Sequence, residues 1–162
     1  MNIFIKEHKE MILMLAKYEV EFMLIGGYAV IYYGYGRTTE DLDIWLKPDN
    51  DNKVKLLKAL KEIGIIKAHL NKLSKIDFTK VNVFSLGEKP YKIDFLTKVQ
   101  GVEWDEAIKN SRQLPFENSI IQVIYYQHLI VNKMLNDRPK DKADVDELQK
   151  INKHRRPPFD FN

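Results

Sequence analysis

Cysteine is absent from the 162 residues of the chain, which excludes disulfide bridges, thiolate zinc sites and a cysteine nucleophile. The sequence also lacks any run of about 20 apolar residues, the length that a membrane-spanning helix needs. Its N-terminal region has no apolar core followed by the small residues of a signal-peptide cleavage site. We therefore expect a globular protein without a membrane partner, and a cytoplasmic location.

An excess of charge of either sign is also lacking. The chain has 26 basic and 23 acidic residues, a formal net charge of +3, which is too balanced to predict nucleic-acid binding from composition. The lysine-rich stretch from Lys53 to Lys75 is expected to form the solvated side of a helix and its loop. A track for the phosphate backbone of an RNA acceptor is the weaker alternative for this stretch.

Hydrophobic periodicity and turn residues predict alternating helices and strands along the chain. The first predicted helix ends near residue 18. The other predicted helices cover 28–33, 54–63, 102–109, 125–135 and 140–151. The predicted strands cover 21–25, 41–46, 81–84, 91–96, 112–116 and 120–124. We expect the third and fourth strands to form a hairpin, and the last two to be short edge strands around a turn.

This order of elements predicts an α+β fold, in which a mixed β-sheet is flanked by helices and followed by a C-terminal helix pair. No repeat, low-complexity segment or linker divides the sequence. We therefore predict a single domain over residues 1–152 and a C-terminal tail over residues 153–162. The sequence does not indicate an oligomeric state.

Two aspartates on one predicted strand are the first candidate site residues. Asp41 and Asp43 are two residues apart, so both carboxylates point to one face of the strand while Leu42 and Ile44 point to the core. Side chains about 7 Å apart along the backbone can share cations, and without a cation their repulsion raises at least one pKa. Magnesium prefers such oxygen ligands. The same alternation places Trp45 on this face, where it would either form the base of a nucleotide pocket or pack as a half-buried side chain.

An Asp-x-Asp pair alone has several explanations. A solvated strand edge is one, and an aspartyl phosphatase is another, although Ile44 and Trp45 replace the small residue and threonine usual there. Gly26 and Gly27 add weight because glycines at a strand-to-helix turn let the backbone approach a phosphate. Arg37 and the adjacent Thr38 lie just before Asp41, and an arginine can bind two phosphate oxygens at once.

Asp94 supplies a third acid on a later strand. Its neighbours Ile93 and Phe95 are apolar and point to one face, so Asp94 points to the other. The alternative role for Asp94 is an ion pair with Lys92 or Lys98, which share its side of the strand. The addition of Asp94 turns a common acidic pair into a predicted two-metal site.

These motifs together resemble the nucleotidyltransferase superfamily related to DNA polymerase β. The similarity is carried by Gly26-Gly27, by the segment Arg37-Thr-Thr-Glu-Asp-Leu-Asp43 and by Asp94, and it extends from Phe22 to about Leu148. The compact prokaryotic branch that includes AbiEii-type toxins is the most similar in its motifs. It shares a C-terminal helix pair, with Asn132-Lys133 and the element from Arg138 to Asp144 here. Many relatives have serine after the first glycine, where this chain has Gly27.

The resemblance implies a polymerase β-like fold and a metal-dependent transfer of a nucleoside monophosphate from an NTP, with release of pyrophosphate. It implies two Mg²⁺ ions, or alternatively Mn²⁺, held by Asp41, Asp43 and Asp94. The nucleotide-binding residues that it implies are Gly26, Gly27, Arg37, Thr38 and Lys133.

The acceptor is open among tRNA, a protein and a small molecule, and the AbiEii-type similarity implies a toxin with a cognate antitoxin. Asp141 and Asp144 share a helical face and either orient Lys133 or Arg138 or face solvent. The competing hypothesis for the whole chain is a module that keeps the fold and binds a nucleotide or a partner without turnover. A glycosyltransferase is disfavoured by the chain length and by the Gly-Gly turn.

Overall fold

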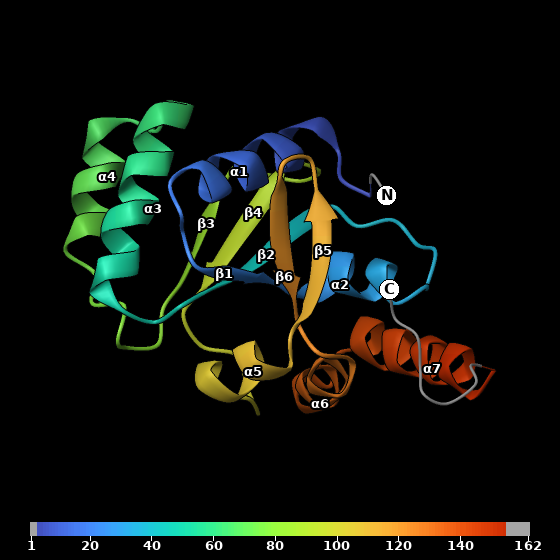
Figure 1. The fold of residues 1–162 in the computed structure, drawn as a ribbon. Coiled ribbons are helices and arrows are strands. Elements are labelled where there is room, and N and C mark those ends of the chain that lie inside the picture. The colour runs from blue at the N-terminus through green and yellow to red at the C-terminus, as the bar shows by residue number, and fades with distance from the viewer. Residues whose placement is uncertain (1–2, 155–162) are drawn as a thin grey trace.

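The computed structural model describes residues 3–154. The helices are α1 (Lys6–Lys17), α2 (Gly26–Tyr32), α3 (Asn50–Ile63), α4 (Lys67–Ser74), α5 (Trp104–Asn110), α6 (Tyr126–Asn136) and α7 (Pro139–Lys153). The strands are β1 (Phe22–Leu24), β2 (Asp41–Leu46), β3 (Val83–Leu86), β4 (Lys92–Leu96), β5 (Arg112–Phe116) and β6 (Ser119–Val123). In Figure 1, α5, α6 and α7 gather below the sheet, and α3 and α4 lie side by side beyond one edge.

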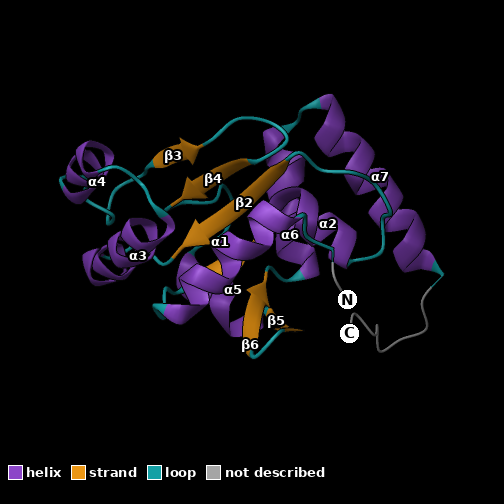
Figure 2. Ribbon diagram, turned by 90° about the horizontal axis from the view of Figure 1, so that it is seen from above, coloured by secondary structure: helices purple, strands orange, loops and turns teal. Residues whose placement is uncertain are grey.

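The strands form one mixed sheet in the order β3-β4-β2-β1-β6-β5. At its centre β2 runs parallel to β4 and antiparallel to β1, which runs parallel to β6. The view from above in Figure 2 separates α3 and α4 from α7, which lies on the opposite side of the molecule. The predicted α+β fold, with a mixed sheet and a C-terminal helix pair, is confirmed.

Strand β2 has one apolar and one acidic face, as its alternation predicts. Leu42, Ile44 and Leu46 are fully buried in the core. Asp41 and Asp43 on the other face are only partly exposed, because the helix pair α6–α7 approaches that side of the sheet. Strand β2 therefore carries both the core and the acidic pair.

Helix boundaries follow local chemistry. Asp49 caps α3 by accepting a hydrogen bond from the backbone N–H of Asn52 (2.7 Å), and Gly64 ends the helix at φ +102°, a conformation that suits glycine. At the start of α7, Pro139 occupies the first turn, where its missing N–H costs no helical hydrogen bond. The predicted end of α3 at residue 63 agrees with the structure, whereas the helix begins four residues before the predicted start at 54; α7 begins one residue before and ends two residues after the predicted range 140–151.

Three sequence expectations differ from the structure. Strand β6 is internal, because it pairs with β1 on one side and β5 on the other. Helix α4 forms where a loop was expected. Leu73 is the one residue of this helix that is buried, so the helix has too few apolar positions for its periodicity to be recognised. The predicted tail starts inside α7, which ends at Lys153, and residues 155–162 lie outside the described part of the chain.

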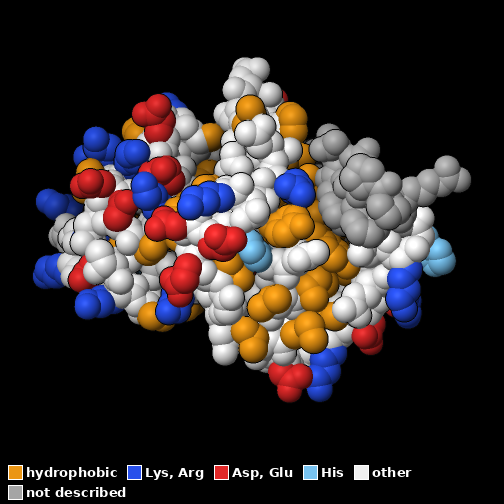
Figure 3. Space-filling view, turned by 60° about the horizontal axis from the view of Figure 1, so that its bottom comes forward, with side chains coloured by type: hydrophobic (Ala, Val, Ile, Leu, Met, Phe, Trp, Pro, Cys, Tyr) orange, Lys and Arg blue, Asp and Glu red, His pale blue; other side chains and the backbone are white. Residues whose placement is uncertain are grey.

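The surface differs between the two sides of the molecule. In Figure 3, charged side chains crowd the side of α3 and α4, whereas hydrophobic side chains gather over the middle of the lower face. Exposed apolar residues of α6 include Val131, Met134 and Leu135. Among residues 3–154, no helix combines the length and apolar character needed to cross a membrane.

Candidate active site

The three predicted acids lie on adjacent strands. In the parallel pairing of β2 and β4, Asp43 is directly opposite Asp94, and Asp41 is opposite Lys92. Residues opposite each other point to the same face of a sheet, so Asp41, Asp43 and Asp94 share the face that α6 and α7 approach. The structure thus brings together the acids that the sequence placed on two separate strands.

Asp43 packs directly against the start of α2. Gly26 has φ +63°, and a Cβ atom at this position would lie 2.0 Å from Asp43 Oδ2. The backbone N–H of Gly27 donates a hydrogen bond to the Asp43 carboxylate. The two glycines, which the sequence predicted as phosphate ligands, therefore also make room for the central acid and hold it. They belong to the first turn of α2 itself, since that helix begins at Gly26.

The pKa of Asp43 is raised from 3.8 to about 6. Burial is the largest cause, and the charges of Asp94 and Asp41 add to it. The charge of Lys133 and the hydrogen bond from Gly27 act in the opposite direction. The repulsion predicted from the Asp-x-Asp spacing is thus present, and it falls on Asp43.

Asp41 and Asp94 differ in their partners. Asp41 Oδ1 is buried without a hydrogen-bond partner in the described part of the chain. Asp94 accepts a hydrogen bond from the Ser85 hydroxyl and lies 3.2 Å from Lys92 Nζ, so the alternative ion pair with Lys92 does form. Lys98 pairs instead with Glu103 at 3.7 Å. Within residues 3–154, no three His, Asp or Glu side chains are close enough together to enclose one metal ion.

Arg37 is engaged by an acid from the far end of the chain. Its Nε and Nη2 donate to the two carboxylate oxygens of Asp144, at 2.7 and 2.9 Å, and its Nη1 donates to the carbonyl of Thr38. The Thr38 side chain is exposed, and Thr39 instead lies near Gly27, where a Cβ would meet the Thr39 hydroxyl at 2.5 Å. Arg37 therefore makes structural contacts, and of Thr38 only the backbone carbonyl takes part in them.

Lys133 is buried between two acids of α7. Its Nζ lies 3.1 Å from Asp141 Oδ1 and 2.8 Å from Asp144 Oδ2. Arg138 completes the group, with its Nε donating to Asp141 Oδ2 at 2.7 Å. Burial alone raises the pKa of Asp141, but the hydrogen bonds from Arg138 and Lys133 outweigh it and lower that pKa. Of the two roles left open for these acids, orienting the cations is the one observed.

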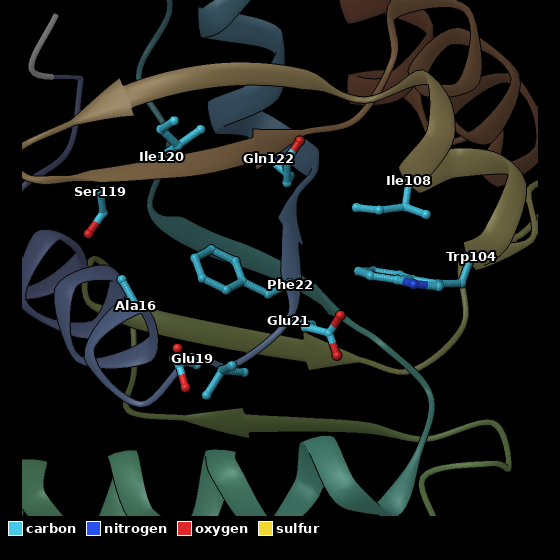
Figure 4. Close-up of a pocket in the computed structure, with 10 residues that line it drawn as sticks. Ala16, Glu19, Glu21, Phe22, Trp104, Ile108, Ser119, Ile120 and Gln122 are labelled. Atoms are coloured by element: carbon cyan, nitrogen blue, oxygen red, sulfur yellow. The ribbon is translucent and has the colours of Figure 1, made fainter.

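A pocket of about 230 Å³ lies beside Asp43 and Gly26. Cationic and amide side chains line most of its remaining wall: Lys98, Gln100, Asn132, Lys133, Asn136 and Arg138. A second cavity of about 440 Å³, drawn in Figure 4, lies between Phe22, Trp104 and Ile120. None of the predicted site residues lines this second cavity, so the candidate chemistry belongs to the smaller, cationic pocket.

Some residues near the acids were not predicted as part of the site. Ser85 contacts Asp94 because β3 pairs with β4 in the register Ser85 to Asp94, and no local signal fixes that register. Trp45 is fully buried, donates to the Thr97 carbonyl (3.3 Å) and packs edge-to-face on Trp104. Of its two predicted roles, packing is therefore the observed one.

Comparisons with known proteins give the family and the fold of the chain. A family model described as "Nucleotidyl transferase of unknown function (DUF2204)" matches residues 5–160. No curated protein matches the sequence significantly. Among solved structures, the lincomycin-bound lincosamide antibiotic adenylyltransferase LnuA is similar, with a TM-score of 0.58 over 93% of this chain and 99% of that chain. At 18% identity, this likeness concerns the fold.

The contact between Gly26 and Asp43 predicts a severe effect of Gly26→Ala. The methyl group would collide with the carboxylate and would also occupy a left-handed conformation, which costs about 1–2 kcal/mol by itself. We expect a loss of at least this much unfolding free energy, measured by urea denaturation. Gly36→Ala is the matched control, because a Cβ there meets nothing within 4 Å. Equal stability of the two variants would contradict the proposed close approach.

The raised pKa of Asp43 predicts a stability that depends on pH. Because the folded-state pKa of about 6 exceeds the ordinary 3.8, the stabilising contribution of protonated Asp43 is complete below pH 4 and is lost as pH rises through 6. We expect Asp43→Asn to be more stable than wild type at pH 8 in the presence of a chelator, by no more than about 3 kcal/mol. The difference should vanish near pH 4.

Urea unfolding at several pH values measures this difference. Glu40→Gln is the control, since Glu40 is an exposed carboxylate next to the acidic pair. An Asp43→Asn protein that is less stable than wild type at pH 8 would show that the ionised carboxylate is stabilising.

Proposed function

The chain belongs to the nucleotidyl transferase family DUF2204, and from this premise we propose that it transfers a nucleoside monophosphate from an NTP to an acceptor hydroxyl, releasing pyrophosphate. One observation carries the proposal. Asp43 lies opposite Asp94 on parallel strands, against the Gly26 turn and beside a cationic pocket. Carboxylates on one side and cations on the other are what phosphoryl transfer requires for its metal ions and its triphosphate.

Pairs of the acidic residues, rather than all three around one ion, are the candidates to hold divalent metal ions. The buried Asp41 Oδ1 lacks a protein partner within the described residues, and an unpaired buried oxygen is costly unless another ligand satisfies it. The Asp43 carboxylate is repelled by Asp94 and Asp41, a repulsion that a cation reverses. Mg²⁺ or Mn²⁺ ions bound by Asp41, Asp43 and Asp94 would supply charge neutralisation for the triphosphate and the acceptor oxygen.

The side chains of the site divide the remaining work. Of the three acids, Asp94 lies nearest to β3, and it already accepts a hydrogen bond from the Ser85 hydroxyl. It is therefore the candidate to accept the proton of the acceptor hydroxyl. Before doing so, it must leave the ion pair with Lys92. Lys133 lines the same pocket as Asp43, and its positive charge acts on that carboxylate. Gly26 leaves room for the Asp43 carboxylate against the start of α2.

The acceptor is proposed by class. The structurally similar LnuA is named for the adenylylation of a lincosamide antibiotic, and an analogous small-molecule hydroxyl is one candidate. The resemblance to AbiEii-type toxins favours tRNA as another candidate, with a cognate antitoxin as partner. A protein side chain is the third, and label transfer distinguishes the three classes directly.

A binding module without turnover is the alternative function. The repulsion at Asp43 argues against it. Three acids on one face lower stability when no cation is present, and a protein that only binds a partner gains nothing from retaining that arrangement.

The first test is label transfer from α-labelled NTPs with Mg²⁺ to total cellular RNA, to protein and to a small-molecule extract. We expect wild type to label one of these fractions. Asp94→Asn should lower the rate at least about a hundredfold, because a proton acceptor contributes on that scale. Glu40→Gln should retain full activity as the matched carboxylate control. Absence of transfer to all three fractions would contradict catalysis.

The second test is metal-dependent nucleotide binding. Because the carboxylates are proposed to bind the metal that also contacts the triphosphate, Mg²⁺ and NTP should raise the thermal unfolding midpoint more together than the sum of their separate effects. In Asp43→Asn this cooperative part should disappear. An NTP effect that is the same with Mg²⁺ and with a chelator would show that nucleotide binding does not use the acids.

A further inference from the structure

Two arginines, Arg37 and Arg138, lie near the acidic cluster, and only one of them is positioned to bind a ligand. On the basis of the proposed function, we propose that Arg138 binds the β- and γ-phosphates of the nucleotide. Asp144 is the positioning residue that holds Arg37 in a structural role. This reverses the expectation from the sequence, in which Arg37 binds phosphate because it precedes Asp41.

All three guanidinium nitrogens of Arg37 are already used. Two of them form the paired hydrogen bonds to Asp144, and the third donates to the Thr38 carbonyl. Only 14% of the Arg37 side chain is exposed, and Asp144 is 1% exposed. Removing a guanidinium from a buried carboxylate leaves an uncompensated charge, which is strongly unfavourable. A phosphate that bound the Nε and Nη2 edge of Arg37 would therefore have to compete with a buried, bidentate partner.

Arg138 is in the opposite situation. Its side chain is 71% exposed, and it lines the pocket that also contains Gly26 and Asp43. It makes one close hydrogen bond to Asp141, at 2.7 Å from Nε, and a long one of 3.4 Å from Nη2. The hydrogen bond with Asp141 raises the pKa of Arg138, and the charge of Asp43 contributes, so the guanidinium is within electrostatic range of the catalytic carboxylate.

The charges around Lys133 indicate what kind of ligand this pocket accepts. Asp141 and Asp144 face three cations, namely Arg37, Lys133 and Arg138. Within these ion pairs the cations outnumber the acids by one, and Arg138 is the most exposed of the three cations. If Arg138 turned toward an anion, Asp141 would keep its contact with Lys133 at 3.1 Å. An excess planar guanidinium beside amide donors suits a polyphosphate, whose oxygens it binds in pairs.

Calorimetric titration with MgATP, magnesium tripolyphosphate and AMP tests the assignment. The variants are Arg138→Gln, Arg37→Gln and, as a surface control on the same helix, Lys142→Gln. We expect Arg138→Gln to weaken binding of MgATP and tripolyphosphate at least about tenfold, with little change for AMP and an unfolding midpoint like that of wild type. Lys142→Gln should bind all three like wild type.

Arg37→Gln should instead lower the unfolding midpoint by several degrees, because Asp144 loses its bidentate partner. The double variant Arg37→Gln with Asp144→Asn should recover part of this loss, since it removes the unpaired carboxylate. Binding by Arg37→Gln is measured at a temperature where circular dichroism shows it folded. There it should retain MgATP affinity within about threefold of wild type.

The outcomes separate the two levels of the proposal. No binding of MgATP or tripolyphosphate by wild type would overturn the proposed function and the phosphate role together. Wild-type binding that is unaffected by Arg138→Gln, or abolished in folded Arg37→Gln, would overturn only the assignment of Arg138. A double variant no more stable than Arg37→Gln would overturn the positioning role of Asp144.

Discussion

The ion pairs of Asp144 connect parts of the chain that the sequence keeps far apart. Its carboxylate binds Arg37, from the loop before β2, and Lys133, from α6, while it sits itself on α7. Buried charges are tolerated only when every partner is present, so these contacts form together or not at all. The acids on β2, the glycine turn of α2 and the cations of the helix pair consequently share one fixed arrangement. The pocket beside Asp43 exists because this arrangement brings α6 and α7 against the sheet.

On the opposite side of that pocket, the arrangement of the residues lowers the stability of the folded protein. Asp43 is placed where burial and two neighbouring acids raise its pKa to about 6. Gly26 gives up side-chain contacts so that the carboxylate fits beneath the start of α2. Proteins keep such unfavourable arrangements mainly at functional sites, where a ligand supplies the missing compensation. The contrast between the well-paired acids of α7 and the poorly paired acids of β2 is the reason for proposing the chemistry on β2 and β4.

The sequence was informative where the signal is local. Alternation placed Asp41 and Asp43 on one face of β2 with its boundaries as observed, and it placed Asp94 between buried Ile93 and Phe95. Contacts between residues far apart in the chain could not be predicted from the sequence. Nothing near Arg37 indicates that its partner lies on the last helix, and the same residue type at the same position suits either a phosphate or a carboxylate. Helix α4 and the internal position of β6 were not predicted for a similar reason, because tertiary packing and strand order determine them.

The charges of the whole site argue for a metal more strongly than any single residue does. Among residues 3–154, Lys92 is the one cation that forms an ion pair with Asp41, Asp43 or Asp94. The charges of Lys133 and Arg138 on the helix side are matched by Asp141 and Asp144, so Arg37 supplies the one further cation of that group. A triphosphate entering this pocket brings several more negative charges to within a few ångströms of the acids. In a partly buried site such repulsion is weakly screened, and one exposed arginine cannot offset it. The proposed function therefore requires the nucleotide and divalent cations to bind together, because the acids repel the triphosphate unless a cation lies between them.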